Sequence, residues 1–382
     1  MNEENIRVRL LALRRFAIPV AIVGLALAAL AAILWPARFF PSYLFGFLFW
    51  MGITLGSLPI LMLHHLVGGH WGFPLRRVFE AAASTLPLMA IFAVVLFFGL
   101  QYLYEWARPG AMEESALLRH KQIFLNLPAY TLRLVLAFAV WGALAFFLLR
   151  WSREQDGMRD PAPTIRLRIL SGPGLVLFCL VTTFIYIDWI MALEPDWYSS
   201  IFPVVVIIGQ VLCALSLAIF LFTSISPVGV WKPHEVPTQF NHLGNLLLAF
   251  VLFWTYVSFG QILIIYAGNL PHEVGWYLHR MDGGWLWIGI LLALVQFAVP
   301  FLVLLFRTVK RRQSSLRWVA FGLLGAQLLA NFWYVAPSFR RAFSVDWIDP
   351  ITVIAIGSAW LVIFSNRILS RPLLPKNDPR QI

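Results

Sequence analysis

The chain has 382 residues, of which 60% are hydrophobic and only 12% are charged, and yet its formal net charge is +11. A typical soluble domain is about 45–50% apolar and about 25% charged. This balance excludes a soluble globular enzyme, a disordered tail and a coiled coil. On a chain this apolar, an excess of positive charge predicts a membrane-topology signal rather than a surface for nucleic acid.

Ten apolar runs are long enough to cross a bilayer, which requires roughly 20 residues per helix. Runs of this length must be helical, because a strand facing lipid would leave its backbone groups unpaired. The sequence therefore predicts an all-α polytopic membrane protein, a single membrane domain over 1–382. Its ten spans lie near 16–34, 43–66, 80–103, 129–149, 169–192, 201–224, 243–267, 285–306, 317–336 and 348–369.

The first of these runs follows the basic stretch Arg7–Arg15 and is similar to a signal peptide. Its apolar part is longer than the usual h-region of about 7–15 residues. We therefore expect a retained first span.

Basic residues predict the orientation of these spans. An even number of spans puts both termini on one side, and that side then holds 21 of the 29 basic residues. They are Arg7, Arg9, Arg14, Arg15, Arg76, Arg77, the five arginines from Arg150 to Arg168, Lys232, the five basic residues from Arg307 to Arg317, Arg367, Arg371, Lys376 and Arg380. By the positive-inside rule, we expect both termini in the cytoplasm.

The order of spans indicates two related halves. The connections after span 4 and after span 8 are both short and strongly basic. We predict two four-helix bundles, 43–192 (spans 2–5) and 201–336 (spans 6–9), flanked by spans 1 and 10.

Asp188 is an acidic residue inside the fifth predicted span, near its outer end. A carboxylate inside a membrane is costly and by default indicates a functional site. Two interpretations stay open. The residue is either an acid at the water interface within an aromatic belt, or a proton-relay group that also suits a quinol hydroxyl.

Span 7 carries Tyr256, Ser258 and Gln261, and Glu273 follows its outer end. Ser258 and Gln261 are three residues apart and share a helix face. Polar groups at this density usually bond neighbouring helices. The alternative is an outer proton path through Tyr256, Gln261 and Glu273.

His64, His65 and Glu80 lie at the cytoplasmic ends of spans 2 and 3. Adjacent histidines point to different sides of a helix and cannot clamp one metal together. The two cysteines, Cys179 and Cys213, cannot form a CxxCH haem attachment or a four-cysteine cluster site. We therefore expect no metal or redox cofactor on this chain. His64, His65 and Glu80 are either interfacial anchors or the mouth of a proton entry.

Three segments together resemble a known family. They contain Asp188-Trp-Ile-Met with Glu194-Pro-Asp-Trp-Tyr-Ser, then Phe253-Trp-Thr-Tyr256 with Phe259-Gly-Gln261 and Pro271-His-Glu273, with Trp276-Tyr277 and Arg280 following, and finally His64-His65 with Arg76-Arg77 and Glu80-Ala-Ala. They are similar to the second NrfD-like membrane subunit (the ActF type) of alternative complex III, the bacterial quinol:cytochrome c oxidoreductase. The likeness runs from span 2 to the start of span 8, about two thirds of the chain.

This resemblance implies a ten-helix subunit that braces the membrane arm, carries no haem or cluster and has polar half-channels for protons. It implies a homologous NrfD-like partner with the quinol site, an iron–sulfur subunit, and multihaem and monohaem cytochrome c subunits. Two positions depart from the family: His272 stands where a second acid often precedes Glu273, and Gly260 where a serine often precedes Gln261. Both departures weaken an outer path through span 7.

Two other functions stay open. The chain is either itself the quinol-oxidising subunit, with the ring near Asp188, or a stand-alone secondary transporter. Internal repeats and an intramembrane acid fit a transporter, but the paired broken helices of such folds are not evident in the sequence.

Overall fold

The computed structural model describes residues 3–69, 71–157, 160–225, 235–375 and 377–378. Within these ranges, ten helical segments are long and apolar enough to cross a membrane, which confirms the ten predicted spans. They are α1 (Glu3–Leu34), α2 (Pro36–Val67), α3 (Arg76–Ala83) with α4 (Leu86–Phe97), α8 (Leu127–Gly157), α9 (Ala162–Trp189), α10 (Phe202–Ile225), α11 (Val236–Gly268), α13 (Trp285–Leu292) with α14 (Val299–Leu305), α16 (Gln313–Val335) and α17 (Ile348–Leu369). The protein is therefore an all-α polytopic membrane protein.

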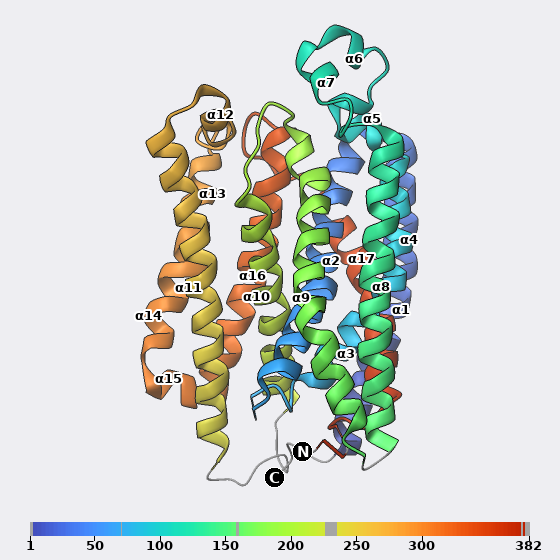
Figure 1. Cartoon of the computed structure of the whole chain (residues 1–382), viewed down its shortest axis with the longest axis vertical. Coiled ribbons are helices and arrows are strands. Elements are labelled where there is room, and N and C mark those ends of the chain that lie inside the picture. Colours follow the sequence, from blue (N-terminus) through green and yellow to red (C-terminus); the bar gives the residue numbers. More distant parts are fainter. Residues whose placement is uncertain (1–2, 70, 158–159, 226–234, 376, 379–382) are drawn as a thin grey trace.

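Short helices close the two ends of this bundle. At one end lie α5 (Leu100–Leu103), α6 (Ala111–Glu114), α7 (Ala116–His120) and α12 (Pro271–His279), and α6 and α7 stand above the other helices (Figure 1). At the other end lies α15 (Arg307–Arg311), and there α1 begins and α17 ends. We call this end the terminal side and the other the opposite side. Its assignment to the cytoplasm stays a prediction, and of the basic residues behind it Arg159, Lys232, Lys376 and Arg380 lie outside the described residues.

α2 and α10 form the centre of the molecule. In the most apolar part of α2, 94% of the residues are buried, against 22% in α11. A Cβ atom on Gly56 of α2 would clash with the backbone of α10, reaching the carbonyl carbon of Gln210 at 2.5 Å and the nitrogen of Val211 at 2.9 Å. Glycine at this position therefore lets the two central helices approach closely, as small residues do between membrane helices.

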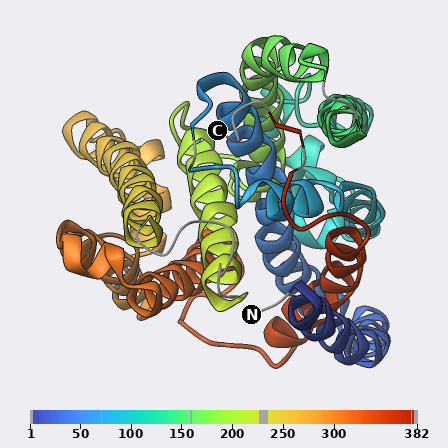
Figure 2. The ribbon, with the colours of Figure 1, turned by 90° about the horizontal axis from the view of Figure 1, so that it is seen from below.

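The other spans surround this centre on two sides (Figure 2). α4, α8 and α9 contact α2, while α11 and α16 contact α10. α1 packs along α17, which also contacts α2 and α3, so spans 1 and 10 lie together on the α2 side. The division into two four-helix bundles stays a prediction.

The third span is interrupted next to a proline. α3 ends at Ala83 and α4 begins at Leu86, with Pro87, which has no N–H to donate, in the first turn of α4. The hydroxyl of Thr85 in this turn donates to the carbonyl of Ala82 at 2.6 Å and lies 2.8 Å from the hydroxyl of Thr54. The indole of Trp360 donates to Thr54 at 2.9 Å. A small network of hydrogen bonds therefore joins α2, the α3–α4 turn and α17 inside the protein.

We predict that Gly56→Ala weakens the fold. The added methyl group meets backbone rather than a flexible side chain, so α2 and α10 must separate, and overpacking of this kind costs about 1–3 kcal/mol. The midpoint of thermal unfolding in a mild detergent should fall. Gly142→Ala in α8, where a Cβ meets nothing within 4 Å, is the matched control and should leave the midpoint unchanged or raise it. Equal midpoints for both variants would contradict the close α2–α10 approach.

Candidate functional site

Asp188, the intramembrane acid, is half of a buried ion pair. Its two carboxylate oxygens accept hydrogen bonds from Nε and Nη2 of Arg133 on α8, both at 2.7 Å. The Asp188 side chain is 2% exposed, and the Arg133 guanidinium also donates to the carbonyl of Phe124 and lies 3.8 Å from its ring centre. A bidentate pair of this kind fixes both side chains. The pair therefore joins α8 to α9 near the opposite side of the membrane.

Aromatic side chains pack around the part of α9 that carries this acid. The Trp141 indole donates to Thr182 at 3.1 Å, and the Tyr104 hydroxyl donates to the carbonyl of Trp189 at 3.2 Å. Trp189 is fully buried and also contacts Phe47 of α2 edge-on, with ring centres 5.1 Å apart. The sequence left two roles open for Asp188, an interfacial acid or a proton-relay and quinol-binding group, and the structure adds an arginine partner to this carboxylate.

Glu194 forms a second such centre in the connection after α9. It accepts from Nη1 of Arg280 at 2.9 Å and from the Ser338 hydroxyl at 2.7 Å. Arg280 is 1% exposed, donates to the carbonyls of Trp276 and Tyr334, and stacks 3.6 Å above the Trp276 ring. Burial lowers the pKa of Arg280 to about 10 and Glu194 counteracts this, so the guanidinium stays charged at neutral pH. This centre joins α12 to the ends of α9 and α16.

Asp349, in the first turn of α17, forms a third centre. Its oxygens accept from both Nη atoms of Arg340, at 2.7 and 2.8 Å, and from the Ser42 hydroxyl of α2 at 2.6 Å. The sequence reasoning assigned no role to this residue or to Glu194. Glu194 and Arg280 both lie in segments that carry the family resemblance, and that was the available signal.

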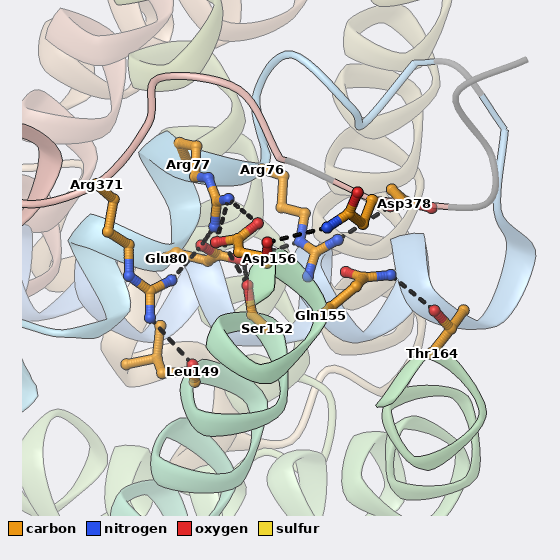
Figure 3. A network of polar contacts seen from close by, with 11 residues as sticks. Arg76, Arg77, Glu80, Leu149, Ser152, Gln155, Asp156, Thr164, Arg371 and Asp378 are labelled. Carbon is orange, nitrogen blue, oxygen red and sulfur yellow. Dashed lines mark hydrogen bonds and ion pairs between the residues drawn. The ribbon is translucent and has the colours of Figure 1, made fainter. Parts of the chain in front are cut away.

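Glu80 lies on the terminal side at the centre of an arginine cluster (Figure 3). Its carboxylate, on a side chain 5% exposed, accepts from Arg76 at 2.8 Å, from Arg77 at 2.7 Å and from Arg371 at 3.0 Å. The Ser152 hydroxyl of α8 donates to it at 2.5 Å. Within the described part of the chain, Glu80 therefore bonds arginines and a serine rather than His64 or His65.

The two histidines lie on the last turns of α2. Both are buried, at 2% and 5% exposure, and their ring centres are 5.6 Å apart at an angle of 50°. The His64 ring meets Trp71 edge-on, and Gly72 packs so closely on this ring that a Cβ atom there would overlap it. Their position is thus inside the protein rather than on a membrane-facing surface.

The structure separates the residues of the predicted outer path. Gln261 is 3% exposed and faces the interior, whereas Tyr256 is 76% exposed on another face of α11. Five residues along a helix make about 1.4 turns, so the two side chains point about 140° apart around the helix axis, which explains the separation. Glu273 lies half-buried on α12, with a carboxylate oxygen 3.9 Å from the position of a Cβ on Gly268. Only Gln261 of these three therefore lines the interior.

Gln261 belongs to a set that the sequence analysis missed. Four helical segments, α10, α11, the π-helical segment Ala293–Ala298 between α13 and α14, and α16, each contribute one buried glutamine. We call these residues the glutamine layer: Gln210, Gln261, Gln296 and Gln327. Each lies about two to three helical turns from the opposite-side end of its span, so they share a depth.

The amides of this layer lack protein partners. No hydrogen bond within the described ranges reaches Oε1 of Gln210, Nε2 of Gln261, Nε2 of Gln327 or either amide atom of Gln296. Buried polar atoms in native proteins are nearly always bonded to protein, water or ligand. The segment around Gln296 is also π-helical, a geometry that frequently marks functional sites. The layer therefore offers buried hydrogen-bonding capacity that water can satisfy.

A cavity of about 370 Å³ opens on the opposite side beside the Asp188 pair. Phe124 and Ile187 line it together with Met191 and Tyr198, so it is mainly apolar. Lys121 supplies the one charge in its lining and donates to the carbonyl of Pro195. Burial lowers the pKa of this lysine, and Asp196 opposes the shift.

Comparison with known proteins adds no assignment to this site. No protein-family model matches the chain, and no curated protein matches it. In the described ranges, no group of three or more histidine, cysteine or acidic side chains is placed to hold a metal ion. The functional argument therefore rests on the buried ion pairs and the glutamine layer.

We predict that Asp188 and Arg133 are coupled in stability. Asp188→Asn leaves a buried guanidinium without its counter-charge, and breaking such a pair costs about 3–5 kcal/mol. Asp188→Asn and Arg133→Gln should each lower the unfolding midpoint in detergent. The double variant should lose much less than the sum of the two single losses. A double-mutant cycle measures this coupling, and additive losses would contradict the pair.

Proposed function

We propose that this chain is a non-catalytic membrane subunit of a bacterial quinol:cytochrome c oxidoreductase of the alternative complex III type. One observation carries the proposal: the three segments of the resemblance supply residues to three of the four buried ion-pair centres, those of Asp188, Glu194 and Glu80. The first supplies Asp188 and Glu194, the second Arg280, and the third Arg76, Arg77 and Glu80. A family-like sequence pattern therefore coincides with the residues that hold the helices in place.

These centres suit a subunit that braces a membrane arm. Each one joins elements far apart in the sequence: Arg133 and Asp188 are 55 residues apart, Arg280 and Glu194 86, and Arg371 and Glu80 291. Buried charge pairs contribute less to net stability than to a defined arrangement. In the proposed complex, the quinol, the haems and the iron–sulfur clusters belong to partner subunits, and this chain carries none of them.

The glutamine layer supports a proton-conducting role. A primary amide both donates and accepts hydrogen bonds, so a ring of amides can order a chain of water molecules without burying a charge. The layer lies in the membrane interior on the α10 side, while Glu80 lies at the terminal side and Glu273 beyond the opposite end of α11. A route through this subunit would use the layer as its middle part.

Quinol oxidation on this chain is the second candidate. The cavity of about 370 Å³ is within the usual size of ligand pockets, roughly 300–1,000 Å³, and its lining is apolar. Three acids adjoin its lining residues: Glu194 and Asp196 flank Pro195, and Asp188 follows Ile187. The Asp188 carboxylate already accepts two hydrogen bonds from Arg133, so it cannot take a quinol proton without breaking the pair. This candidate therefore ranks second.

A secondary transporter fits the helix geometry less well. Transporters with repeats break corresponding helices in their two halves. Here the interruptions fall at Ser84–Thr85 in span 3 and at Ala293–Ala298 in span 8. The counterparts of these spans in the predicted halves are spans 7 and 4, and α11 and α8 are continuous helices.

We predict that the native protein co-purifies with haem-containing partners. After extraction in a mild detergent, its band in a native gel should stain for haem, and mass spectrometry should find a homologous membrane subunit beside it. A protein that migrates alone, with no haem protein, would contradict the complex. If the complex is found, photolabelling with a quinol-site inhibitor should mark the homologous subunit. Labelling on this chain would favour the second candidate.

We also predict that the glutamine layer matters for protons and not for folding. Gln296→Leu and Gln327→Leu replace amides that lack protein partners, so stability should be retained or raised. The number of protons released per electron should fall in the purified complex, with haem spectra unchanged.

Gln155→Leu is the matched control for these variants, because Gln155 is equally buried but donates to Thr164 on the terminal side. It should lower stability and leave the proton number unchanged. An unchanged proton number in the layer variants would reduce the layer to a structural feature.

A further inference from the structure

We propose that the terminal side binds the headgroup of an anionic phospholipid between the ends of α8 and α17. An open cavity of about 390 Å³ lies there, and its lining consists of Arg153, Asp156, Arg367, Ser370 and Arg371. A narrower cavity that shares Arg153, Arg367, Ser370 and Arg371 continues inward to Arg77, Glu80 and Ser84. Three of the five residues around the open cavity are arginines, so its chemistry is that of an anion site.

The acids near this cavity are already bonded. Asp156 accepts from Nη2 of Arg77 at 2.5 and 2.6 Å, and Glu80 accepts from Arg76, Arg77 and Arg371. The guanidinium groups of Arg153 and Arg367 bond no acidic side chain in the ranges that the structure describes, and both residues are exposed. Two cations therefore face the open cavity with their bonding capacity free. Arginine suits phosphate in particular, because its planar fork donates two parallel hydrogen bonds.

An apolar stripe continues from this cavity into the membrane. Ser84 lines the narrower cavity, and Leu88, Ile91, Val95 and Phe98 follow it at alternating spacings of four and three residues. Residues at this spacing share one helix face. Ile91 is 65% exposed and Phe98, which follows α4, is 73% exposed, while Leu88 and Val95 are half-buried, so this face is partly open to lipid. Arginines above an apolar stripe match a phospholipid, with its phosphate in the cavity and its acyl chains on α4.

A bound phosphate would join α8 and α17, which make few contacts with each other. Arg153 lies on α8 and Arg367 on the last turn of α17. Arg371 bonds Glu80 of α3 and the carbonyl of Leu149 on α8, so it already connects the chain after α17 to both helices. One anion between Arg153 and Arg367 would complete this connection on the exposed side. The inference is independent of the proposed respiratory role.

Native mass spectrometry of the full chain tests this site. The protein is placed in nanodiscs made of equal parts of phosphatidylglycerol and phosphatidylcholine, released, and the ratio of the two retained lipids is measured. The wild-type protein should retain phosphatidylglycerol preferentially. Arg153→Gln with Arg367→Gln should reduce this preference by at least about tenfold, since the loss of even one charge-assisted contact corresponds to roughly that factor. The charge-preserving pair Arg153→Lys with Arg367→Lys should keep most of it.

The control removes the same charge elsewhere on the same side. Arg311 is the last residue of α15 and Arg312 follows it, and both are exposed. Arg311→Gln with Arg312→Gln should leave the lipid ratio unchanged. Equal loss in both double glutamine variants would show a general charge effect and overturn the site. An unchanged ratio in the Arg153 and Arg367 variant would overturn it as well. Binding of inorganic phosphate to the wild-type protein in phosphatidylcholine nanodiscs, with no lipid preference, would identify a free-phosphate site and overturn the assignment to lipid.

Discussion

The arrangement of this protein depends on one constraint: a carboxylate taken out of water must meet a cation with hydrogen bonds in place. An unpaired buried ion costs several kcal/mol, far more than any single packing contact contributes. Among the described residues, Asp188, Glu194, Asp349 and Glu80 all satisfy this constraint with arginine. Because Arg133, Arg280 and Arg371 come from other elements than the carboxylates they bond, satisfying the charge also fixes how helices and connections meet.

The same constraint divides the interior into two kinds of polar structure. The charged centres lie near the ends of the spans, where arginine side chains can reach carboxylates and backbone carbonyls. The middle of the α10 side instead contains neutral amides with open hydrogen-bonding capacity. Bidentate pairs such as Arg133–Asp188 resist rearrangement, whereas amides exchange partners at little cost. Rigid support and proton conduction therefore fall to different residues in the proposed function.

The sequence predicted those features that depend on local composition. Length and hydropathy are properties of each run, so all ten spans were predicted close to where the structure has them. Asp188 was recognised because a single acid stands out in an apolar run, but its partner was not, because Arg133 lies in another span and was counted as an outer basic residue. The glutamines gave even less signal. Gln210, Gln296 and Gln327 are single uncharged residues in three separate spans, and only the packing of those spans places them at one depth.

The excess of positive charge acquires a second meaning from this geometry. As a topology signal, each arginine on the terminal side is equivalent to any other. In the structure they differ: Arg76 and Arg77 pair with Glu80 and Asp156, whereas Arg153 and Arg367 line a cavity and bond no acidic side chain among the described residues. A charge kept only for orientation needs no fixed neighbours and no cavity. Two arginines held at the ends of neighbouring helices, above an apolar stripe, therefore point to a ligand with both a phosphate and acyl chains.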